Sequence, residues 1–396
     1  SGNVRIETTE SAEGTTTDAD ITLSAPLESD GAVSILSSDN LNLGANGDIS
    51  ITSGSGTVDI DSAGAVIMDA GSLIDTATNA SDNAVLVTAG GSIALGSIDA
   101  GTAAVAIVGS TITNAGVLAE NVTASTLFLK AEAVAGGIGT STTAMKLAVG
   151  TLAARAGTGG MYLQESDALT IGDTTAVTVT RVQYDGEAAS TSPSEAARSD
   201  LQTAGNLVLR VAGALTVVDG SDPVNGQSGL GIGLDGNLLL ESTNSTIALN
   251  AGVNSTSGSI MVVAEDAVSQ AAAGDITTNA SGETIFVASM LDAISMADGA
   301  TAETNDGNIF YSAGGDITLG GLDAGTAEVF VDSASGNIFD SGGANPEVIA
   351  SKARLEAGGS VGSSTGRTML ELTVGTLAAS GETGVFIRNS TSLVVN

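Results

Sequence analysis

Two copies of one stretch decide the fold: GSIALGSIDAGTAAVAI at Gly91–Ile107 and GDITLGGLDAGTAEVFV at Gly315–Val331. In each copy, two triplets with aliphatic first and third residues flank a short segment that contains an Asp and a Gly. The alternation indicates short strands with one buried face, and Asp and Gly favour a turn between them. One such unit cannot bury its own apolar face. It needs a neighbour stacked on it, so the chain is expected to be a repeat structure.

Alternating apolar pairs recur along the whole chain. The first ones are Val33/Ile35, Leu41/Leu43, Ile49/Ile51, Val58/Ile60 and Val66/Met68. Two short strands in roughly every 17–20 residues are typical of a β-solenoid, and the pattern predicts an all-β fold of about 20 stacked coils. An antiparallel sandwich or barrel is the alternative for many short strands. An aromatic content of 2% weighs against it, because such folds usually contain more large aromatic residues.

A longer repeat of about 225 residues overlies the short one, since residues 91–171 are echoed by 315–395. The composition keeps one character throughout, so we expect one continuous solenoid over 1–396. The alternation stops near residue 184, and an insertion over 183–204 is predicted. Within it, Ser192-Pro193-Ser194-Glu195 has the form of a capping box, which predicts a short helix over 193–201. The apolar pair Leu393/Val395 falls in mid-repeat, so we expect more chain or another copy to stack there.

Charge and composition exclude several function classes. Against 45 acidic residues there are 11 basic ones, giving a formal net charge of −34, which disfavours nucleic acid and anionic membranes as partners. The sequence has no His and no Cys, which removes His-based catalytic triads, Cys nucleophiles and His-ligated zinc. No apolar run approaches the roughly 18 residues of a membrane span.

The runs GGSIALGSIDAG, VGTLAARAGTGG and AGGDITLGGLDAG resemble the repeats of filamentous haemagglutinin-type exoproteins and adhesins of Gram-negative bacteria. The resemblance covers nearly the whole chain except about 183–204. It implies a right-handed parallel β-helix, export across the outer membrane and display as a fibre. We therefore expect a structural, non-enzymatic segment of an extracellular or cell-surface fibre or adhesin, with itself, surface glycans or matrix as partners. The alternatives are a carbohydrate-active β-helix, such as a polysaccharide lyase or tailspike-like hydrolase, and a calcium-dependent glycan-binding module.

No catalytic, cofactor-binding or metal-ligating residue is predicted. Asp99 and Asp323 occupy equivalent turns, where an Asp is far more often a turn cap than a catalyst. The segment GLGIGLDGN at 229–237 resembles one calcium-binding β-roll nonapeptide, but such sites need tandem copies. Together with Asp48, Asp306 and Asp316, which lie next to glycines before strands, it predicts only weak, unspecific binding of divalent cations such as calcium.

Two phenylalanines are candidate contact residues. Alternation places Phe310 and Phe330 on the outward face, because Ile309, Tyr311, Val329 and Val331 take the inward positions. Such an aromatic track would suit a lateral or glycan contact, whereas a one-residue change of register would bury both rings.

Overall fold

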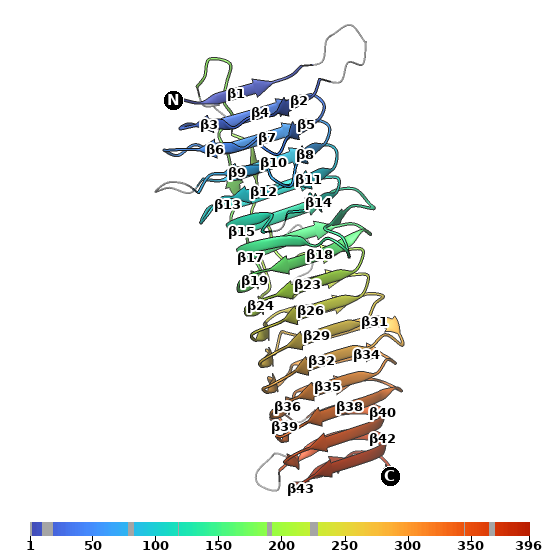
Figure 1. The fold of residues 1–396 in the computed structure, drawn as a ribbon. Coiled ribbons are helices and arrows are strands. Elements are labelled where there is room, and N and C mark those ends of the chain that lie inside the picture. The colour runs from blue at the N-terminus through green and yellow to red at the C-terminus, as the bar shows by residue number, and fades with distance from the viewer. Residues whose placement is uncertain are drawn as a thin grey trace. The chain divides into compact units, whose positions relative to one another are not determined.

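The computed structural model describes residues 2–9, 19–77, 83–117, 119–187, 192–221, 229–343, 345–363 and 369–396. Over these ranges the chain is all-β, and its strands form a parallel β-solenoid of about 14 coils (Figure 1). The fold class predicted from the alternating apolar pairs is confirmed. No helix able to span a membrane occurs in the part of the chain described. Contacts divide the chain into unit 1 (Ser1–Asp167, Gly172–Gly205 and Ser221–Val224) and unit 2 (Ala168–Ile171, Asn206–Gly220 and Asn225–Asn396).

One coil of unit 1 contains three strands, and this explains why the predicted number of about 20 coils is wrong. Strands β4 (Val33–Ser37), β5 (Leu41–Leu43) and β6 (Ile49–Ile51) pair in parallel with β7 (Val58–Ser62), β8 (Val66–Met68) and β9 (Leu73–Asp75) of the next coil. The sequence pattern assigned two strands to each coil. The pair Ile49/Ile51 was therefore counted as the start of a new coil, although it is the third strand of the same one.

The core consists of apolar columns that run from coil to coil. In unit 1, Val33, Val58, Val85, Val105 and Leu127 lie in register on neighbouring strands and are at most 1% exposed. Each such side chain contributes roughly 1.5–3 kcal/mol through burial. Because aliphatic residues of medium size fill most inward positions, the core stays thin and needs few aromatic rings.

The long sequence repeat is also a repeat of strand lengths. In unit 1 the series is β11 (Ile93–Leu95), β12 (Ser97–Asp99), β13 (Ala104–Gly109), β14 (Ile112–Asn114), β15 (Val122–Ala131), β16 (Gly137–Ile138) and β17 (Met145–Ala156). In unit 2 it is β36 (Ile317–Leu319), β37 (Gly321–Asp323), β38 (Glu328–Ser333), β39 (Ile338–Asp340), β40 (Val348–Ala357), β41 (Ser360–Val361) and β42 (Leu370–Gly381). Both series have lengths of 3, 3, 6, 3, 10, 2 and 12 residues, so positions in the two copies can be equated.

The helix predicted over 193–201 is wrong. In its place β21 (Ser194–Glu195) pairs antiparallel with β20 (Val177–Thr178), and β22 (Leu201–Thr203) pairs with β17 as part of a coil. The Glu195 carboxylate accepts hydrogen bonds from the Arg198 guanidinium at 3.1 and 2.9 Å. Strand pairing thus determines the structure here, although the sequence Ser192-Pro193-Ser194-Glu195 resembles a helix capping box. Residues 173–187 and 192–199, called the arm below, form this departure from the coils.

Candidate functional site

Unit 2 carries a column of outward aromatic side chains. Strands β32 (Ile285–Ser289), β35 (Ile309–Ala313) and β38 pair in parallel and bring Phe286, Phe310 and Phe330 to the same position of successive coils. These three residues are called the aromatic column below. Tyr311, next to Phe310, is fully buried, whereas Phe310 is half-buried. The outward placement predicted for Phe310 and Phe330 is therefore confirmed, and the register that would have buried them is wrong.

The three rings stack along the column. The ring centroids of Phe286 and Phe310 lie 5.0 Å apart with the planes only 6° from parallel. Phe310 and Phe330 follow at 4.7 Å with an angle of 43° between the planes. Aromatic pairs at these separations gain about 0.5–1.5 kcal/mol beyond their burial. Phe286 was not singled out from the sequence, although an apolar residue between Ile285 and Val287 carries the same outward signal as Phe310.

Arg354 closes the stack on the far side of Phe330. Its guanidinium carbon lies 5.0 Å from the ring centroid of Phe330, within the range of a cation–π contact. The same guanidinium donates to the Glu356 carboxylate at 2.9 and 2.6 Å. Arg354 therefore covers the ring face of Phe330 that Phe310 does not.

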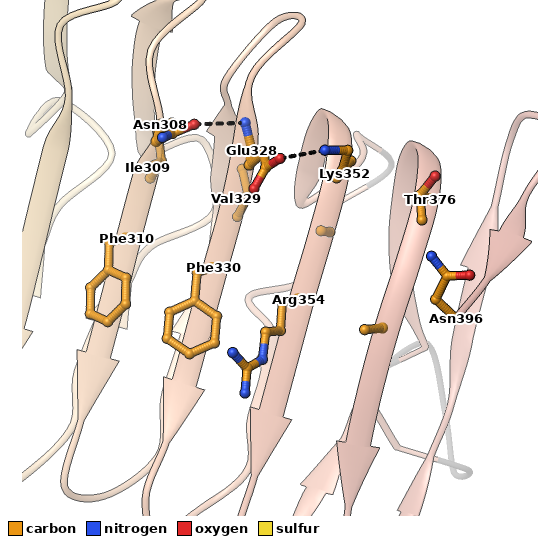
Figure 2. A pocket seen from close by; sticks show the side chains of 12 residues that line it. Asn308, Ile309, Phe310, Glu328, Val329, Phe330, Lys352, Arg354, Thr376 and Asn396 are labelled. Carbon is orange, nitrogen blue, oxygen red and sulfur yellow. Dashed lines mark hydrogen bonds and ion pairs between the residues drawn. The ribbon is translucent and has the colours of Figure 1, made fainter.

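A shallow hollow of about 410 Å³ lies beside the end of the column (Figure 2). The Glu328 backbone N–H donates to Asn308 Oδ1 at 3.1 Å, and the Lys352 ammonium donates to the Glu328 carboxylate at 2.6 Å. Among the residues that line the hollow, Glu328 is the one carboxylate, and Lys352 is its partner. The lining thus combines this ion pair with the rings of Phe310 and Phe330.

A second hollow in unit 2, of about 270 Å³, is acidic. Its lining includes Asp298, Glu303, Asp323 and Glu347. Burial raises the pKa of Glu347 to about 8, and the nearby carboxyl of Asp340 adds to the rise. Two carboxyl groups in so little water favour the neutral form of one of them.

The aspartates singled out from the sequence cap turns. Asp99 Oδ1 accepts the backbone N–H of Gly101 at 3.0 Å, and Asp323 Oδ1 accepts that of Gly325 at 2.9 Å. Both glycines have φ near +55°, a conformation that side chains disfavour. Asp306 accepts both the backbone N–H and the hydroxyl of Thr326, which lowers its pKa. The Asp99 and Asp323 carboxylates thus cap their own turns, and the Asp306 carboxylate binds the corresponding turn of the next coil.

The segment 229–237 is part of an ordinary coil. Residues Leu230–Leu234 form β25, which pairs in parallel with β28 (Gly252–Ser255), and the carboxylate of Asp235 accepts the hydroxyl of Thr256. Within the ranges described, no three Asp or Glu side chains come close enough together to hold a metal ion.

In unit 1 the column equivalent to the aromatic column is covered by the arm. Leu86, Ala106 and Phe128 lie in register on β10 (Val85–Ala89), β13 and β15, and they form an apolar cluster with Val177 and Val179 of the arm. All five side chains are at most 5% exposed. The arm therefore converts an outward sheet face into a second, small core.

An ion pair fixes the arm farther along the same face. The Arg181 guanidinium donates to Asp59 at 2.8 and 3.1 Å and to Asp61 at 2.9 Å. The Asp59 side chain is only 1% exposed, so this pair is largely shielded from water. The two carboxylates, Asp59 above all, raise the pKa of Arg181 and keep it charged.

No protein-family model matches this chain, and neither the curated proteins nor the solved structures contain a match.

Proposed function

We propose that the chain is a structural, non-enzymatic segment of an extracellular or cell-surface fibre or adhesin, of the filamentous haemagglutinin type suggested by its repeats. The observation that carries the proposal is the run of inward apolar columns, such as Val58, Val85 and Val105, continued from coil to coil within a unit. Each interior strand pairs with a strand on both sides, so each added coil contributes hydrogen bonds and buried area to its neighbours.

Polar side chains add rungs between coils. Asp316 Oδ1 accepts the backbone N–H of Asn337 at 2.7 Å, and Asn337 Oδ1 accepts that of Ser360 at 2.8 Å in the next coil. Such side-chain hydrogen bonds satisfy backbone N–H groups in the turns that strand pairing does not use. They suit a stiff shaft better than an enzyme with moving loops.

Negative-stain electron microscopy of the purified chain, with calcium and with a chelator, tests this proposal. Narrow, unbranched, stiff particles whose form is the same in both conditions are expected. Compact round particles, or rods that appear only with calcium, would contradict it and favour a calcium-dependent module.

The acidic hollow supports a second candidate, a carbohydrate-active β-helix. Asp323 and Glu347 both line it, and a carboxyl that is protonated near neutral pH is a feature of general acids. The lining contains no Arg or Lys, which polysaccharide lyases of this architecture use beside their carboxylates. Turnover of acidic or neutral polysaccharides that disappears in an Asp323→Asn/Glu347→Gln variant would establish this candidate, and its absence from the wild type would remove it.

A further inference from the structure

The aromatic column of unit 2 is the uncovered counterpart of a face that unit 1 covers. Leu86 pairs with Ala106 in unit 1 as Phe310 pairs with Phe330 in unit 2, at the same place in the repeat. In unit 1 both side chains are at most 5% exposed beneath the arm, whereas both phenylalanines remain half-buried. The same sheet position is thus buried in one copy and open in the other.

The covering segment in unit 1 has a definite chemistry. Residues 176–182, AVTVTRV, run extended, with Val177 and Val179 buried and Thr178 exposed between them. The Val182 backbone N–H donates to Ser34 Oγ at 2.9 Å, and Arg181 pairs with two carboxylates of the sheet. The segment therefore combines β-branched residues at alternating positions with one cation.

Acidic side chains also lie beside the aromatic column. On the same strand as Phe330, Asp332 lies at the next outward position, and it is in register with Glu356 of the neighbouring strand. Asp59 of unit 1 is in register with Leu86, so Phe286 takes its place in unit 2, and Asp332 is a carboxylate at a different position beside the column. An acidic side chain beside the rings, on a chain of net charge −34, favours a segment that carries a cation as well as apolar residues.

Ring orientation disfavours a sugar as the occupant. Sugars stack on the open face of an aromatic ring, but the faces in this column are used within it. Phe310 lies between the rings of Phe286 and Phe330, and Arg354 covers the other side of Phe330. Aliphatic side chains can pack against these rings without a free ring face. A second copy of the chain is disfavoured as well, because lateral contact would bring together two chains of net charge −34.

We propose that the aromatic column binds an extended polypeptide segment of the chemistry of residues 176–182, with β-branched side chains at alternating positions and a cation. The segment lies along the column as the arm lies along the equivalent column of unit 1. This goes beyond the structural function proposed above and does not depend on it.

A synthetic peptide of residues 173–187 with a fluorescent label is the probe, titrated with the full chain and followed by anisotropy. Saturable binding is expected, weakened at least about fivefold in a Phe310→Ala/Phe330→Ala variant. Phe339→Ala is the matched control, because Phe339 is an outward, half-buried ring on another strand of the same unit, β39, and should leave binding unchanged. A peptide with Val177→Asp and Val179→Asp should not bind.

Crosslinking locates the site independently of the stability of these variants. A peptide with benzoylphenylalanine in place of Val179 should label the strands β35 and β38 of the wild-type chain. Absence of binding at millimolar peptide, or labelling confined to unit 1, would overturn the proposal. So would concentration-dependent dimers of the wild type that the phenylalanine variants abolish, or an oligosaccharide that competes for the same labelled strands.

Discussion

Glu347 in unit 2 occupies the position that Asn121 holds in unit 1. Each residue directly precedes the ten-residue strand of its copy, and each is at most 2% exposed. Each also accepts a backbone N–H from the next coil, that of Glu371 for Glu347 and that of Lys146 for Asn121.

The chemistry at this shared position differs. The Asn121 side-chain amide donates to the carbonyl oxygens of Leu95 and Gly96 at 2.9 and 3.0 Å and to Asn114 at 3.2 Å. A carboxylate has no N–H to donate, and the counterpart of Asn114 in unit 2 is a second acid, Asp340. Burial raises the pKa of Glu347, and the nearby carboxyl of Asp340 adds to the rise. A proton on Glu347 also restores one donor.

The first prediction follows for the pH dependence of stability. The pKa of Glu347 is about 8 in the folded chain against an ordinary value of 4.5, so folding favours its protonated form. The free energy of unfolding should therefore fall as the pH rises from about 5 to about 8, by up to about 4 kcal/mol in total, and then level off. Glu347→Gln should remove this part of the decline, measured by urea denaturation at a series of pH values.

Glu303→Gln is the control for this prediction, because Glu303 lines the same hollow but is exposed. It should keep the wild-type pH profile. If Glu347→Gln and the wild type lose stability in parallel between about pH 5 and about pH 8, the burial of the Glu347 charge is not what limits stability.

Glu165 gives a second prediction, in which stability again falls as the pH rises. It is 1% exposed, burial raises its pKa to about 7, and its carboxyl accepts the Val149 backbone N–H at 3.1 Å. Its equivalent in unit 2 is the amide of Asn389, which accepts from Val374 N–H and donates to Val374 O, both at 3.0 Å. Glu165→Gln should therefore be tolerated, and stability should depend less on pH between about 5 and about 7.

Thermal midpoints of the Glu165→Gln variant and the wild type should converge near pH 5 and separate above pH 7, with the variant higher. Glu28→Gln, at an exposed carboxyl of the same unit, should leave the midpoints equal at both pH values. A Glu165→Gln variant that is less stable throughout would show that the amide does not replace the protonated acid.

The repeat made much of this fold predictable. Val105 and Val329 could be placed inward, and Phe330 outward, because a strand alternates its faces and the two copies agree. The number of strands in a coil could not be predicted from the sequence. The apolar pair of a third strand, such as Ile49/Ile51, has the same pattern as the pair that begins a coil. The arm could not be read either: Val177 and Val179 alternate like a coil strand, and only the paired sheet shows that they cover another face.

A third prediction concerns the ion pair that fixes the arm. Arg181→Ala would leave the carboxylate of Asp59, 1% exposed, without its guanidinium partner. A loss of about 3 kcal/mol in the free energy of unfolding is expected, because the charge of Asp59 remains shielded from water. Arg210→Ala is the matched control: Arg210 is 59% exposed and pairs with Glu241 at the surface, so its loss should cost less than about 1 kcal/mol. Equal losses in the two variants, measured by urea denaturation, would contradict the role given to Arg181.

The fourth prediction separates arm docking from coil folding. Val179 is 1% exposed in the cluster with Leu86 and Ala106, whereas the neighbouring Thr178 points to solvent. Val179→Asp would place a charge in this cluster, so the arm should detach while the coils stay folded, because their inward columns do not include it. Hydrogen exchange should then quicken by at least about tenfold at the amides of 174–182, with the amides of β10 and β13 unchanged. Thr178→Asp should preserve the wild-type rates. Faster exchange throughout unit 1 in the Val179→Asp variant would mean that the folding of the coils requires the arm. The uncovered aromatic column of unit 2 would then be stabilised by the stacking of its own rings instead.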